Sequence, residues 1–191
     1  MKAKQRLLFF IQSCLKPREV GAVSPSSSFL AKAMAKEIAP EKMGDLTLEL
    51  GGGTGSLTRG LLLHGIDPKK LMIIEKNPVM ALELRKKFPD CDIKEFDAQS
   101  LEALAKKESI SLLSSIVSGL PLRSLPKTVR DNILNSAFSL LAYQGRFIQF
   151  TYGFKSPVPE ELLLKHQIKI LKKVWIFHNF PPATVWVYEK G

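Results

Sequence analysis

A glycine-rich turn, set between a short apolar run and an amphipathic stretch, constrains the fold of this chain more than any other feature. Residues 46–50 are mainly apolar, four glycines follow between positions 51 and 55, and residues 56–64 carry apolar side chains at helical spacing. Strand, tight glycine turn and helix, in that order, build a cofactor site at the carboxyl end of the first strand of an open α/β sheet. We therefore expect such a site here.

Apolar runs and helical stretches continue to alternate along the chain. Because helices separate most of the strands, we expect an α/β fold with a mainly parallel, seven-stranded Rossmann-like sheet and helices on both faces. The last two strands have no helix between them, which predicts an antiparallel pair at the C-terminal edge. The predicted strands are residues 46–50, 71–75, 92–96, 113–117, 145–152, 168–177 and 184–189. The length favours one domain, residues 1–191, with residues 1–40 as an N-terminal helical cap.

The balance of charge is strongly basic, with 28 Lys and Arg against 18 Asp and Glu and a net charge of +10. Such a chain is attracted to polyanions, either nucleic acid or an anionic lipid surface, although the charge can also serve solubility alone. No apolar run reaches the roughly 18–20 residues that span a bilayer, and we recognise no signal peptide. The two cysteines, Cys14 and Cys91, lack metal or redox spacing, so we expect no metal and a cytoplasmic location.

Residues 2–16 predict an amphipathic, basic helix. Leu7, Leu8, Ile11 and Leu15 fall on one face, and the segment contains lysines and an arginine but no acid. Such a helix can lie in a membrane interface, with its lysines at the headgroups, or can cover the edge of the sheet. Both alternatives stay open, and a mitochondrial presequence is a weaker third.

Three classes of cofactor compete for the glycine turn. A P-loop needs a Gly-Lys-Ser/Thr sequence, but Ser56 and Leu57 follow Gly55. A dinucleotide site needs a third glycine at position 56. Glu49, directly before the turn, would also repel a pyrophosphate. An acid at this place suits a cationic ligand such as S-adenosylmethionine, which carries a sulfonium and an ammonium group.

The turn itself has the pattern Glu-x-Gly-x-Gly-x-Gly, made by Glu49, Gly51, Gly53 and Gly55. This pattern resembles motif I of the class I S-adenosylmethionine-dependent methyltransferases, and seven strands suit the sheet of that family. The resemblance implies that these four residues bind S-adenosylmethionine. One departure is Gly52, where proline is common in the family.

Two further acids follow predicted strands. Glu75 ends the second strand, which places it to accept both ribose hydroxyls of the cofactor. Asp97 and Ala98 follow the third strand and are expected beside the adenine amino group. A turn of purely structural purpose with surface acids is the alternative.

The end of the fourth strand indicates the methyl acceptor. It reads Ser118-Gly-Leu-Pro-Leu122, whereas the ribosomal RNA adenine dimethylases carry Asn-Leu-Pro-Tyr. Leu122 replaces the aromatic that would stack on a flipped base, and Ser118 replaces the amide that would hold its amine. That family also carries a helical domain after the sheet, and we expect none after the last predicted strand of this chain.

Across most of its length the chain resembles the bacterial phospholipid N-methyltransferases. The stretches that carry the resemblance are residues 20–27, 48–55, 117–122, 149–153 and 179–183. The resemblance implies N-methylation of phosphatidylethanolamine, towards phosphatidylcholine, or of an ornithine lipid. It also implies an anionic membrane surface as partner and peripheral association with the cytoplasmic face of the inner membrane.

Methyl transfer to an amine needs alignment and a deprotonated amine rather than many catalytic side chains. Tyr152 and Ser118 are the candidates for the acceptor site, with Ser118 also near the cofactor, and Phe180 is a further candidate. An aromatic face stabilises a methylated ammonium by cation–π contact. Two rival functions stay open, an RNA adenine methyltransferase and a non-catalytic protein that binds membrane or nucleic acid.

Overall fold

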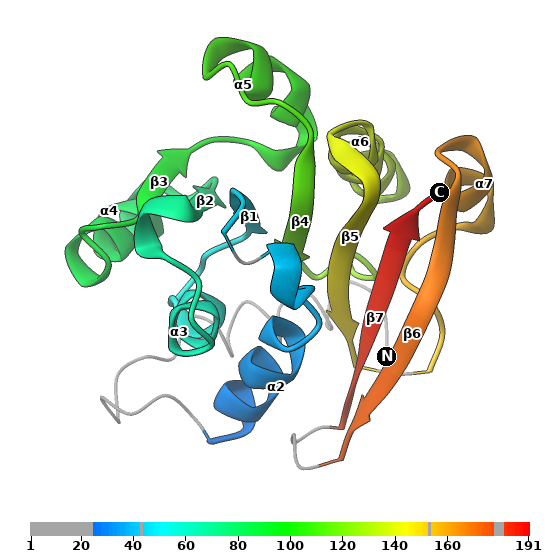
Figure 1. Ribbon diagram of the computed structural model, residues 1–191, viewed down its shortest axis with the longest axis horizontal. Coiled ribbons are helices and arrows are strands. Elements are labelled where there is room, and N and C mark those ends of the chain that lie inside the picture. Colours follow the sequence, from blue (N-terminus) through cyan, green and yellow to red (C-terminus); the bar gives the residue numbers. More distant parts are fainter. Residues whose placement is uncertain (1–24, 43, 153, 178–181) are drawn as a thin grey trace.

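The computed structural model describes residues 25–42, 44–152, 154–177 and 182–191. It contains one seven-stranded sheet with helices on both faces (Figure 1). The strands are β1 (Thr47–Leu50), β2 (Leu71–Glu75), β3 (Asp92–Glu95), β4 (Leu113–Ser118), β5 (Leu141–Thr151), β6 (Ile168–Ile176) and β7 (Ala183–Lys190). The α-helices are α2 (Pro25–Ala35), α3 (Ser56–Leu63), α4 (Pro78–Lys87), α5 (Leu101–Lys107), α6 (Lys127–Ser139) and α7 (Glu160–Lys165). Short 3₁₀ helices are η1 (Pro40–Lys42), η2 (Pro68–Lys70) and η3 (Ala98–Ser100).

The strand order is β3-β2-β1-β4-β5-β7-β6. Strands β1 to β5 pair in parallel, and β7 pairs antiparallel with both β5 and β6. The predicted mainly parallel sheet with an antiparallel C-terminal pair is therefore confirmed. The structure adds that β7 inserts between β5 and β6, so that β6 forms the edge and runs parallel to β1 to β5.

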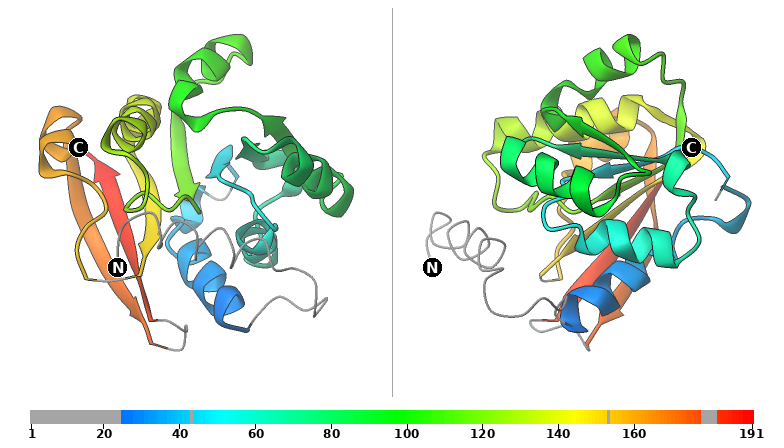
Figure 2. Two further views of the ribbon diagram at one scale, coloured as in Figure 1. Left: turned by 180° about the vertical axis from the view of Figure 1, so that it is seen from behind. Right: turned by 90° about the vertical axis from the view of Figure 1, so that its left-hand side faces the viewer.

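Helices bury both faces of the sheet, as the continuous apolar strands require. One core joins α5, α6 and α7 to the face that carries Leu50, Phe147 and Trp186. The other core joins α2, α3 and α4 to the face that carries Ile73 and Val187 (Figure 2). The two-sided burial leaves the strand ends as the place where polar side chains gather.

The predicted N-terminal cap is described only in part. Helix α2 packs against α3 and the strands β5 to β7, so this part of the cap covers the fold. The predicted helix over residues 2–16 lies outside the described residues and stays a prediction. Within the described part of the chain, no helix combines the length and the apolar character needed to cross a bilayer.

Candidate functional site

The carboxyl ends of four parallel strands bring most of the predicted site residues to one edge of the sheet. Glu49 is the last residue but one of β1, Glu75 ends β2, and Ser118 ends β4. Asp97 follows β3 closely as the N-cap of η3. Ligands of open α/β sheets bind at this edge, beside the point where the strand order reverses. That point is β1, between β2 and β4.

Three glycines of the turn adopt backbone conformations that other residues rarely tolerate. Gly51, Gly53 and Gly55 have φ values of +78°, +52° and +84°. The turn is anchored because the Gly51 N–H donates to the carbonyl of Ile74 on β2 (2.8 Å). The spacing of glycines in the sequence therefore has a direct conformational cause.

Substitution of Gly55 tests how tightly the turn is packed. A Cβ at position 55 would lie 2.4 Å from the Phe88 ring, whereas a Cβ at Gly53 would meet nothing closer than 4.0 Å. We expect Gly55→Ala to lower the free energy of unfolding by roughly 2–4 kcal/mol, from left-handed strain plus overpacking. Gly53→Ala, the matched control, should cost about 1 kcal/mol from strain alone. Urea unfolding measures both, and equal losses would contradict this packing argument.

The side chains around Gly52 explain why glycine, rather than the proline common in the family, stands at this position. Its Cβ position lies 2.6 Å from a methyl of Ile73 and 2.6 Å from a methyl of Leu84. In this chain these two side chains take the space that a proline ring would need.

Glu75 ties the glycine turn to the start of α4. Its carboxylate accepts the N–H of Gly53 (2.9 Å) and the N–H of Asn77 (2.7 Å), one on each oxygen. Asn77 in turn caps α4 through its side-chain oxygen, which accepts from Val79 and Met80. Each carboxylate oxygen retains a lone pair for a further donor such as a ribose hydroxyl.

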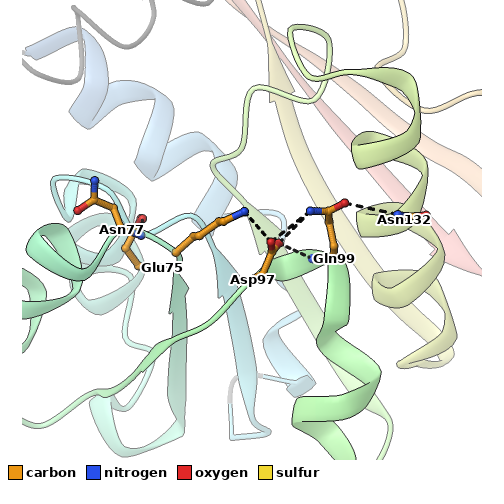
Figure 3. Close-up of polar contacts among 6 residues, drawn as sticks. Glu75, Asn77, Asp97, Gln99 and Asn132 are labelled. Atoms are coloured by element: carbon orange, nitrogen blue, oxygen red, sulfur yellow. Dashed lines mark hydrogen bonds and ion pairs between the residues drawn. The ribbon is translucent and has the colours of Figure 1, made fainter.

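Asp97 lies at the centre of a polar network (Figure 3). It accepts from the Lys76 ammonium (2.7 Å) and from the Gln99 backbone N–H (3.0 Å), and the Gln99 side chain continues the chain of contacts to Asn132 on α6 (3.4 Å). Burial of the carboxylate raises its pKa, but the hydrogen bonds from Lys76 and Gln99 outweigh burial, so the pKa is lowered. Ala98, the next residue, is buried at the start of η3.

Glu49 is the most unusual group of the site, because it is completely buried. Neither of its carboxylate oxygens has a well-formed hydrogen bond among the described residues. Burial raises its pKa from 4.5 to about 8, and the charge of Glu75 adds to the rise, whereas Thr58 on α3 opposes it. A buried acid whose hydrogen bonding to Thr58 is too poorly formed to offset its burial is stabilised by a nearby cation, so Glu49 fits the cationic part of S-adenosylmethionine.

Ser118 forms a second turn that packs on the first. Its hydroxyl accepts the Leu120 N–H (3.3 Å), and the neighbouring Gly119 N–H donates to the carbonyl of Leu50 (2.8 Å). Ser118 is fully buried, so it shapes this turn rather than facing an open surface.

Sequence reasoning did not single out Gln149 on β5, which the structure places beside the predicted site. It is the strand neighbour of Ser118, and its side-chain amide donates to the carbonyl of Leu120 (3.0 Å). Its amide oxygen is buried and has no partner among the described residues. The available signal was a polar amide inside the otherwise apolar end of a strand.

The other acceptor candidates are less central. Tyr152 follows the end of β5, is 47% exposed, and packs its ring 5.4 Å from that of Phe150. Phe180 lies outside the described residues. Leu122 is only 1% exposed and belongs to the core, so this side chain offers no stacking surface for a flipped base.

Comparison with known proteins gives one curated relative of nearly the same length. No family model matches the chain. An ornithine lipid N-methyltransferase from Singulisphaera acidiphila is 29% identical over 171 residues, which cover 87% of this chain and 86% of that protein.

Solved structures share the fold at low sequence identity. Magnesium protoporphyrin IX methyltransferase from Synechocystis PCC 6803, with bound S-adenosylmethionine, has a TM-score of 0.72, 13% identity, and covers 100% of this chain and 98% of its own. An N-methyltransferase from Bradyrhizobium japonicum WM9 has a TM-score of 0.66, 13% identity, and coverages of 87% and 97%. The predicted fold, that of the class I S-adenosylmethionine-dependent methyltransferases, is therefore confirmed. The cofactor in the first structure supports the predicted S-adenosylmethionine.

Proposed function

We propose that this chain, a class I S-adenosylmethionine-dependent methyltransferase, methylates the amine of a membrane lipid headgroup. The observation that carries the proposal is the match to an ornithine lipid N-methyltransferase over 87% of this chain and 86% of the relative. An ornithine lipid is therefore the first acceptor to test, and phosphatidylethanolamine is the second. We place the reaction at the cytoplasmic face of the inner membrane.

The cofactor would lie along the carboxyl edge of the sheet. Glu49 would face its cationic amino acid part, the turn of Gly51, Gly53 and Gly55 would contact it closely, and Glu75 would hold the ribose hydroxyls. Asp97 and Ala98 would lie beside the adenine. When bound, S-adenosylmethionine supplies a methyl group activated by its sulfonium charge.

The protein's part in the transfer is alignment. Transfer would require a deprotonated acceptor amine, in line with the methyl group that the bound cofactor would supply, so the residues of this chain would act by holding the two in register. The turn of Ser118, held by Gln149, would form the polar floor of the acceptor site. Tyr152 would place its ring against the methylated ammonium.

The function can be tested directly with radiolabelled S-adenosylmethionine. The acceptors are vesicles with ornithine lipid, vesicles with phosphatidylethanolamine, and total RNA. We expect label in the lipid fractions, with ornithine lipid preferred. Label in RNA alone would overturn the proposal in favour of an RNA adenine methyltransferase, which the +10 charge favours. Cofactor binding without any transfer would point instead to a binding protein.

Two substitutions of Tyr152 separate the ring from the hydroxyl. If the ring stabilises the methylated amine, Tyr152→Ala should lower the rate of the last methylation about tenfold, and Tyr152→Phe should keep most of it. Mass spectrometry of singly, doubly and triply methylated lipid measures each step. Tyr143→Ala is the matched control, since Tyr143 is 71% exposed near the other end of β5. Equal rates for Tyr152→Ala and the wild type would remove Tyr152 from the acceptor site.

A further inference from the structure

Three exposed aromatic side chains form a cluster on the edge strand β6, on the residue that follows it, and on the loop after β5. Phe154, Trp175 and Phe177 are 67%, 39% and 72% exposed. The rings of Phe154 and Trp175 lie 4.6 Å apart between centroids, and those of Trp175 and Phe177 stack at 6.1 Å. We call these three residues the aromatic patch. Exposed aromatic clusters of this kind mark interaction sites more often than ordinary surface.

A lysine is built into the aromatic patch. The Lys173 ammonium lies 4.5 Å from the ring centroid of Trp175 and donates to the carbonyl of Phe154 (3.1 Å). Lys155, next to Phe154, is also exposed. Strand β6 itself contains no acidic residue between Ile168 and Ile176, so the surface here combines apolar rings with positive charge.

The aromatic patch lies at the carboxyl ends of the strands, as the candidate site does. Because β6 runs parallel to β1, β4 and β5, its carboxyl end, with Trp175, points in the same direction as the ends that carry Glu49 and Ser118. The hairpin of β6 and β7 reaches past the end of β5 in each view (Figures 1 and 2). A surface that contacts the aromatic patch would therefore lie towards the carboxyl ends of the strands, where the candidate site residues are.

We propose that the aromatic patch docks on an anionic membrane surface, with its rings at headgroup depth and Lys173 and Lys155 at the lipid phosphates. Tryptophan prefers this interfacial layer, phenylalanine is common on surfaces that insert into it, and lysines add attraction to anionic lipids. The inference rests on the lipid acceptor proposed above, and it assigns a docking surface within the described residues, separate from the predicted helix over residues 2–16.

Vesicle co-sedimentation of the full chain tests the docking surface. We expect the wild type to bind vesicles that contain phosphatidylglycerol, to bind phosphatidylcholine vesicles less, and to lose binding as salt rises. Phe177→Ser and the double variant Trp175→Ser/Phe177→Ser should bind about tenfold or more weakly, because interfacial binding scales with the apolar area inserted. Tyr143→Ser, at an exposed aromatic near the amino end of β5, is the matched control and should bind as the wild type does.

Folding and function are followed separately. Binding of S-adenosylhomocysteine, measured by calorimetry, should be unchanged in Phe177→Ser, since that side chain is 72% exposed. Vesicle binding equal to wild type in both aromatic variants would overturn the inference. The inference would also be overturned if the Leu7→Asp/Ile11→Asp variant lost all vesicle binding while the aromatic variants bound as the wild type does. If the protein methylates lipid but the aromatic variants dock normally, the proposed function stands and the docking surface is wrong. If docking needs the aromatic patch but no lipid is methylated, the docking surface stands and the proposed function is wrong.

Discussion

Replacement of Glu49 by glutamine is expected to stabilise the cofactor-free protein and, at the same time, to weaken its binding of S-adenosylmethionine. Glu49 is completely buried, and burial raises the pKa of its carboxyl to about 8. Glutamine has nearly the same shape but no charge to desolvate. The variant thus separates two effects of the buried acid, its lowering of the free energy of unfolding and its contribution to cofactor affinity.

The effect on stability depends on pH in a defined direction. Well below pH 4.5 the carboxyl is protonated in both the folded and the unfolded chain, so it does not lower the free energy of unfolding. As pH rises from 4.5 to about 8, the unfolded chain releases the proton while the folded chain keeps it, and the free energy of unfolding falls. The accumulated loss at pH 8 is on the order of 4 kcal/mol, and Glu49→Gln should recover much of it.

Cofactor binding should depend on pH in the opposite direction to stability. A cation beside Glu49 favours the ionised carboxyl, so binding at pH 7 should release up to about one proton, and affinity should rise with pH towards 8. Glu49→Gln should remove this dependence and bind roughly 30-fold or more weakly at pH 8, because one partner of a buried charge pair is lost. Calorimetry in buffers of different ionisation enthalpy measures the proton release.

The matched control is Glu83→Gln, which removes an exposed carboxylate on α4. It should change neither the pH dependence of unfolding between 4.5 and 8 nor the proton release. A wild type that binds the cofactor with no proton exchange at pH 7 would contradict the assignment of Glu49 to the cationic part of the ligand.

The sequence was sufficient to predict the sheet because local signals and tertiary structure agree in it. Periodicity located all seven strands, and the predicted tight turn is confirmed, with positive φ at Gly51, Gly53 and Gly55. The start of β5 was predicted late, at residue 145, whereas the strand begins at Leu141. Gln144 there adopts a φ of +58°, and a register shift accompanies it, so the regular alternation is interrupted.

The parts that could not be predicted depend on contacts between distant residues. Gln149 matters because its side chain reaches Leu120, 29 positions earlier. The aromatic patch requires Phe154 to meet Trp175, and β6 to be the exposed edge of the sheet. Had β6 been a central strand, the same alternation of Lys173, Trp175 and Phe177 would describe a half-buried face, and no local pattern distinguishes the two cases.

Replacement of Glu75 by glutamine is the second change with a large expected effect, and its cause differs from that of Glu49. The carboxylate accepts one N–H from Gly53 and one from Asn77, whereas an amide offers a single acceptor oxygen and turns its NH₂ towards the other donor. We expect Glu75→Gln to lower the free energy of unfolding by about 1–3 kcal/mol through the donor left unsatisfied.

Binding distinguishes the two acids by the part of the cofactor that each one holds. Methylthioadenosine keeps the ribose and lacks the ammonium group, so Glu75→Gln should weaken its binding by about tenfold or more, since a hydrogen bond to a charged group is lost, while Glu49→Gln should not. Glu95→Gln is the matched control, because Glu95 occupies the same register position on the neighbouring strand β3 and is exposed. Equal losses of methylthioadenosine binding in the Glu49 and Glu75 variants would show that the loss comes from general disturbance of the turn. A selective loss in Glu75→Gln would instead place the ribose at the end of β2. Loss of S-adenosylmethionine binding in Glu49→Gln, with methylthioadenosine binding retained, would place the charged part of the cofactor at β1.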